Sequence, residues 1–200
     1  MTENIIICFV VLILIMLVGI MSIVILFYKK NKTEGYLSPN NSKVKEINKR
    51  LIKNANKIMK DLYEHPYIES DRKYILNIMK NFNIDKLKPY KLSNKVGETI
   101  NKGNETYMCY RDKNGFIPDH ILYIVLLHEM AHMGLRKSIQ HPPQFWNLMG
   151  KLVARALELG IINIDDYPKE TVSRCGAPII SSGSIYDLIG NINNEIIEEI

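Results

Sequence analysis

The sequence predicts an α+β fold, in which a single N-terminal transmembrane helix precedes one compact domain of helices packed on a small antiparallel sheet. Three observations lead to this prediction. An uncharged apolar run fills residues 5–28, later segments repeat apolar residues at helical spacing, and two strand-like segments lie between them. The predicted organisation is an anchor at 1–30, a linker at 31–42, a domain at 43–184 and an acidic tail at 185–200.

The apolar run at 5–28 is long enough to span a bilayer. A helix rises about 1.5 Å per residue, so the run covers about 36 Å against about 30 Å of hydrocarbon. It lacks the basic start of a signal peptide and continues into Lys29 and Lys30, so we expect it to be retained. Because no basic residue precedes it, the positive-inside rule predicts a single-pass membrane protein whose C-terminal domain is cytosolic.

Cysteine usage and charge indicate the compartment and the partners. Cys109 and Cys175 form one isolated pair without CxxC spacing, which is the sparse usage expected of a reduced compartment. The net charge of +5 is concentrated between residues 29 and 60, where ten basic residues face two glutamates. Few aromatic residues interleave this segment, which favours attraction to anionic lipid over a nucleic-acid interface. Nucleic acid is therefore not an expected partner.

Apolar spacing predicts the elements that precede the chemical residues. Helices are expected over 43–63 and over 71–82, the second with Ser70 as its N-cap. The segments GETIN and TYMCYR flank a turn at 101–104 and predict a β-hairpin. We expect the second strand of this hairpin to border the functional site.

The second half of the domain is predicted to contain two further helices before its end. The first runs from His120 to about Met133 and stops at Gly134. The next begins at the Pro142-Pro143 pair and closes at Gly160. The following segment reads as irregular, and a short acidic helix is expected over 185–200.

The segment VLLHEMAH carries the strongest chemical signal. His128 and His132 are four residues apart, so on a helix both imidazoles point the same way and can bind one zinc ion. Glu129 follows His128 directly and is therefore rotated by about 100° around the helix axis. From this position its carboxylate can reach a zinc-bound water and act as general base. Apolar residues 121–127 place the motif on a buried helix, where three unpaired polar side chains would be costly without a metal.

A catalytic zinc ion needs a third protein ligand and an open position for water. His141 is the favoured ligand, because it lies nine residues after His132 in a loop that can fold back onto the metal. Glu158, on the following helix, is the alternative third ligand. An equally simple interpretation of Glu158 is a solvated carboxylate near a helix end.

Two further residues can donate hydrogen bonds to a negative charge that develops at the zinc. These candidate transition-state stabilisers are Tyr167 and Arg174, with core packing and surface pairing as the competing interpretations. His65 and His120 receive no role, since their positions suit solvated or capping side chains.

The run LLHEMAHMGLRKSIQHPPQFW resembles the minimal metallopeptidases of the WLM and SprT-like group, in which HExxH and a third His followed by an aromatic residue recur. The resemblance covers about residues 105–182, and it implies a minimal zincin-like fold. It also implies that His128, His132 and His141 are zinc ligands and that Glu129 is the catalytic glutamate. A single-span anchor on such a domain resembles WLM-type proteins of large DNA viruses.

These residues together predict a membrane-anchored zinc metalloendopeptidase that hydrolyses a protein or peptide substrate with zinc-bound water activated by Glu129. One alternative is an inactive, zinc-containing, membrane-tethered binding or assembly protein. The other is a DNA-dependent SprT-like protease, which would show salt-sensitive DNA affinity of the basic segment at 43–60.

Overall fold

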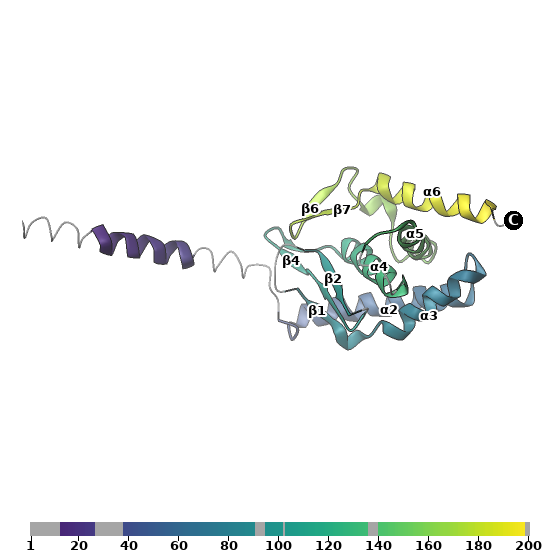
Figure 1. The fold of residues 1–200 in the computed structure, drawn as a ribbon, viewed down its shortest axis with the longest axis horizontal. Coiled ribbons are helices and arrows are strands. Elements are labelled where there is room, and N and C mark those ends of the chain that lie inside the picture. Colours follow the sequence, from purple (N-terminus) through teal and green to yellow (C-terminus); the bar gives the residue numbers. More distant parts are fainter. Residues whose placement is uncertain (1–12, 27–37, 91–94, 102, 136–139, 199–200) are drawn as a thin grey trace, which may run out of the picture. The chain divides into compact units, whose positions relative to one another are not determined.

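The computed structural model describes residues 13–26, 38–90, 95–101, 103–135 and 140–198 (Figure 1). The chain divides into two compact units, residues 1–34 and residues 35–200. Each unit is described by itself.

The structure of the first unit contradicts the predicted membrane anchor. Its described part is a helix over residues 13–26. Within the described residues no helix is both long and apolar enough to cross a membrane, so the predictions of a transmembrane helix over 5–28 and of a single-pass protein with a cytosolic domain are wrong. The remaining residues of that span, the basic residues 29–32 and linker residues 31–37 lie outside the described residues.

The second unit has the predicted α+β character (Figure 1). The helices at 43–63, 71–82 and after Pro142 are confirmed, although Ser70 falls in a 3-10 turn and does not cap α3. The elements in chain order are α2 (Ser42–Glu64), η1 (Glu69–Asp71), α3 (Arg72–Asn81), η2 (Ile84–Lys86), β1 (Leu87–Pro89), β2 (Gly97–Ile100), β3 (Glu105–Met108), β4 (Arg111–Asp112), β5 (Gly115–Phe116), α4 (Asp119–Leu135), α5 (Pro143–Glu158), η3 (Ile164–Asp166), β6 (Val172–Arg174), β7 (Ala177–Ile179) and α6 (Ser182–Glu198).

Helix α4 is the central element of this unit. It contacts α2, α3 and α5 as well as strands β2 and β3, so it is covered on nearly every side. This explains why its sequence is apolar all round and lacks a polar stripe. Residues Leu122, Leu126 and Met130 are at most 1% exposed. The helix that carries the HExxH motif is therefore held in place by core packing on several sides.

The predicted hairpin is confirmed, but the sheet is mixed. Strands β2 and β3 pair antiparallel with Thr99 opposite Thr106, while β1 pairs with β3 in parallel. The strand order is β1-β3-β2, so β2 lies at the edge of this sheet among the described strands. Since α4 packs against β2, the first strand of the hairpin borders the candidate site, and not the second strand as expected.

Gly134 does not stop α4, which continues to Leu135. A Cβ atom at Gly134 would lie 2.6 Å from Cδ2 of Leu148, so the glycine permits the close packing of α4 against α5. Gly160 behaves as predicted, since it follows α5 with a φ of 63°.

The segment predicted to be irregular contains a β-hairpin, β6–β7. Its two-residue turn consists of Cys175 and Gly176, and both have positive φ, as a type I′ turn requires. Cys175 forms a disulfide with Cys109, just beyond β3, across 66 residues of sequence. The expectation of a reduced pair is therefore wrong. The two sulfur atoms meet only because the fold brings the end of β3 beside this turn.

Helix α6 begins earlier than predicted, at Ser182. The Ser181 hydroxyl accepts a hydrogen bond from the backbone N–H of Ser184 at 3.2 Å, which caps the helix start. Helix α6 packs on α5 and buries Ile185 and Leu188, so the first part of the expected acidic tail contributes to the core.

Candidate metal centre

Three histidine side chains converge in the second unit. His128 and His132 project from α4, and His141 lies immediately before the Pro142-Pro143 start of α5. Nε2 of His141 is 3.1 Å from Nε2 of His128 and 3.2 Å from Nε2 of His132. The three residues form a group that can hold a metal ion.

The spacing of these nitrogens fits tetrahedral coordination. Bonds of about 2.0–2.1 Å from zinc to imidazole nitrogen place neighbouring ligands about 3.3 Å apart at the tetrahedral angle. The two measured separations are within about 0.2 Å of that value. His128 is half-buried, and burial, followed by the nearby charges of His132 and His141, lowers its pKa to about 3. It therefore stays neutral at physiological pH, which is the form that binds metals.

Phe145 braces all three imidazole rings from the first turn of α5. Its ring centroid lies 4.8 Å from that of His128 and 4.5 Å from those of His132 and His141. Phe145 is fully buried, whereas Trp146 beside it is 42% exposed and lies 5.3 Å from the His141 ring. An aromatic residue shortly after the third histidine thus orients the rings by packing.

Glu129 faces strand β2 and is 5% exposed. Burial raises the pKa of this carboxyl to about 7, and hydrogen bonds from the hydroxyl and backbone N–H of Thr99 act in the opposite direction. A Cβ atom placed at Gly97 would lie 3.0 Å from Oε1 of Glu129, so the strand passes very close to the carboxylate. Sequence reasoning missed Thr99, for which the only signal was its place in a predicted hairpin next to the motif.

The other sequence candidates lie apart from the three histidines. Glu158, at the end of α5, accepts a hydrogen bond from the Tyr67 hydroxyl at 2.6 Å and pairs with Arg155 at 3.1 Å. Tyr167 is buried and donates a hydrogen bond to the backbone carbonyl of His120 at 2.7 Å. His120 is eight residues before His128, about 12 Å away along α4.

Arg174 also has a partner outside the centre. Its guanidinium forms an ion pair with Asp112, with Nε 2.6 Å from Oδ2. The backbone N–H of Cys175 donates to the same carboxylate oxygen at 3.4 Å. Arg174 therefore fastens the β6–β7 hairpin to β4.

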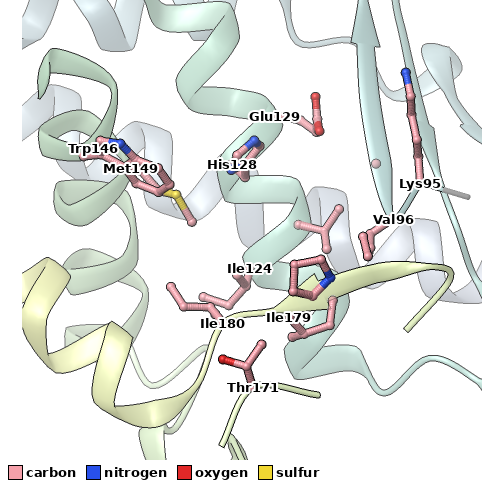
Figure 2. Close-up of a pocket in the computed structure, with 14 residues that line it drawn as sticks. Lys95, Val96, Ile124, His128, Glu129, Trp146, Met149, Thr171, Ile179 and Ile180 are labelled. Atoms are coloured by element: carbon pink, nitrogen blue, oxygen red, sulfur yellow. The ribbon is translucent and has the colours of Figure 1, made fainter. Parts of the chain in front are cut away.

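A cavity of about 490 Å³ opens beside His128 and Glu129 (Figure 2). The start of β2, the middle of α4, α5 and strand β7 form its walls. Figure 2 shows Met149, Ile124 and Ile180 grouped on the side of His128 away from Glu129. His128 thus has a largely apolar cavity next to it.

No family model matches this chain, and no match was found among curated proteins or among solved structures. The resemblance to the WLM and SprT-like group stays a prediction from the HExxH segment, and the function has to be inferred from the geometry of the site.

Proposed function

We propose that this protein is a zinc-dependent peptidase that hydrolyses peptide bonds in an extended protein segment. The observation that carries this proposal is the convergence of His128, His132 and His141 within hydrogen-bond distance, with the buried carboxylate of Glu129 on the same helix. Three imidazoles suit zinc and leave a fourth coordination position open. A zinc ion bound there would supply Lewis acidity, which polarises a carbonyl group and acidifies water.

Glu129 is the general base of the proposed reaction. It accepts a proton from the attacking water and delivers it to the nitrogen of the leaving amine. A pKa of about 7 suits both steps, because the carboxylate can take up and release a proton near neutral pH. The hydrogen bonds from Thr99 hold the carboxylate against β2.

The backbone of β2 supports an extended peptide as substrate. The N–H of Cys109 donates to the carbonyl of Val96, and the N–H of Asn104 donates to that of Ile100. Alternation in an antiparallel pair then directs the N–H and C=O groups of Gly97 away from β3. Because β2 is at the sheet edge among the described strands, a peptide can add there as a further strand beside Glu129.

The test combines metal analysis of the purified full chain with hydrolysis of an unfolded protein. Wild type should contain one zinc ion and cleave the substrate. Glu129→Gln should keep the zinc ion and lower the rate about 100- to 10,000-fold, because only the base is removed. His141→Ala should lose zinc and activity together. His65→Ala is the control, since His65 is exposed at the end of α2.

Each contrary result has a defined meaning. Zinc binding without hydrolysis in wild type would favour the inactive binding or assembly protein. Cleavage that requires added single-stranded DNA would favour the DNA-dependent protease. Equal hydrolysis by wild type and Glu129→Gln would refute the mechanism.

A further inference from the structure

We propose that the apolar cavity beside His128 receives a bulky apolar side chain of the substrate, at the position directly after the scissile bond. The inference rests on the proposed peptidase function. It adds a substrate class, namely protein segments with Leu, Ile, Met or Phe at that position.

The walls of the cavity are aliphatic on three sides. Helix α4 contributes Ile124 and Val125, α5 contributes Met149, and β7 and the residue after it contribute Ile179 and Ile180. Its volume of about 490 Å³ lies within the range of about 300–1,000 Å³ that is usual for pockets that enclose a ligand. Transfer of a large apolar side chain from water into such walls is favourable roughly in proportion to the apolar area buried.

The charged residues of the cavity do not offer a partner to a charged substrate side chain. Lys95 lines the cavity but forms an ion pair with Glu98. Glu129 is the proposed base and is held by Thr99. A charged side chain entering the cavity would lose its hydration without compensation, which disfavours Asp, Glu, Lys and Arg at this position.

The direction of β2 indicates which substrate residue enters. The cavity is lined by Gly97, the first residue of β2, and by Val96 just before it. An antiparallel partner can exchange both backbone hydrogen bonds with Gly97, and antiparallel pairing is the more stable arrangement. The chain direction of such a partner is opposite to that of β2, so its later residues lie against the start of β2. The cavity therefore receives the residue on the carboxyl side of the cut.

The experiment profiles cleavage sites of the zinc-loaded full chain in a library of peptides from a digested proteome, with mass spectrometry of the products. Wild type should cut before Leu, Ile, Met and Phe about 10- to 100-fold more often than before charged residues. A flat distribution at that position, with cleavage otherwise intact, would refute the cavity assignment and leave the peptidase proposal standing. Absence of any cleavage would refute the peptidase proposal itself.

A charge placed in the cavity wall should switch the preference. Ile180 is half-buried there, and Ile180→Glu should move the preference toward Lys and Arg because the new carboxylate pairs with them. Val172→Glu is the matched control, since Val172 lies in the β6–β7 hairpin just before Ile180, is 38% exposed and does not line the cavity. Ile180→Ala, a milder change, should instead favour Phe and Trp. Identical profiles for all three variants and wild type would contradict the inference.

Discussion

Glu129 and His128 are neighbours in the sequence, yet their side chains have different surroundings. His128 points to the other imidazoles and to Phe145, whereas Glu129 points to β2. Burial acts on both but with opposite effects on pKa, because it penalises whichever form is charged. The pKa of His128 falls to about 3 and that of Glu129 rises to about 7. One helix turn thus provides a neutral imidazole and a carboxyl group that titrates near neutrality.

The raised pKa of Glu129 predicts a pH-dependent stability difference in the metal-free protein. The folded state favours the protonated carboxyl, and this contribution is fully present below pH 4.5 and is lost as pH rises through about 7. Glu129→Gln has no carboxyl group to titrate, so it does not show this loss of stability, which amounts to about 3 kcal/mol in wild type. In EDTA, the variant should therefore gain stability relative to wild type between about pH 4 and about pH 8. Urea unfolding of both proteins at the two pH values measures their free energies of unfolding. If the difference between variant and wild type were the same at both pH values, the prediction would be contradicted.

At the scale of elements, the site depends on how closely β2 approaches α4. A Cβ atom at Gly97 would lie 2.6 Å from Cγ1 of Val125 and 3.0 Å from Oε1 of Glu129. Glycine at this position allows the edge strand, the Glu129 carboxylate and the cavity wall to meet. The strand belongs to a hairpin that the sequence predicts, but its contact with α4 is a tertiary feature.

Gly97→Ala should therefore lower kcat/KM about 10- to 100-fold, because the strand or the carboxylate has to move by a fraction of an ångström to about one ångström. Zinc content should be unchanged, since the three histidines are not displaced. Gly190→Ala is the control, as an added Cβ atom at that position of α6 has no neighbour within 4 Å. Peptide hydrolysis compares the two variants, and equal kcat/KM values would show that the approach of β2 is not critical.

At the scale of the whole molecule, the centre is assembled from segments far apart in the sequence. The edge strand, α4, the start of α5 and the β6–β7 hairpin all contribute to the histidine group or to the cavity beside it. Two links fasten the hairpin to the preceding part of the fold: the Cys109–Cys175 disulfide and the ion pair between Arg174 and Asp112. The wall formed by Ile179 and Ile180 therefore depends on long-range contacts.

Replacement of both Cys109 and Cys175 by Ser should lower the free energy of unfolding by about 4 kcal/mol, because the disulfide closes a loop of 66 residues in the unfolded chain. Dithiothreitol should destabilise wild type by a similar amount and leave the double variant unaffected. Cys8→Ser is the control, since it retains the disulfide. Urea midpoints with and without the reductant test this, and a wild-type midpoint insensitive to dithiothreitol would contradict it.

The sequence by itself determined the helices and the composition of the centre. Apolar periodicity placed α2, α3 and α5, and the HExxH spacing placed His128 and His132 on one side of α4. These features depend on residues three or four apart, whose relation follows from helix geometry alone. The same local reasoning was wrong for the apolar run, since no helix among the described residues is long and apolar enough to cross a membrane.

Only the tertiary structure decided what surrounds these residues. It brought His141 to the two helical histidines, left Glu158 and Tyr167 with other partners, and joined Cys109 to Cys175. It also placed β2, and not β3, beside Glu129 and completed the cavity wall with β7. Such contacts join residues tens of positions apart. They depend on how the elements pack around α4, which the spacing of residues within any one segment does not specify.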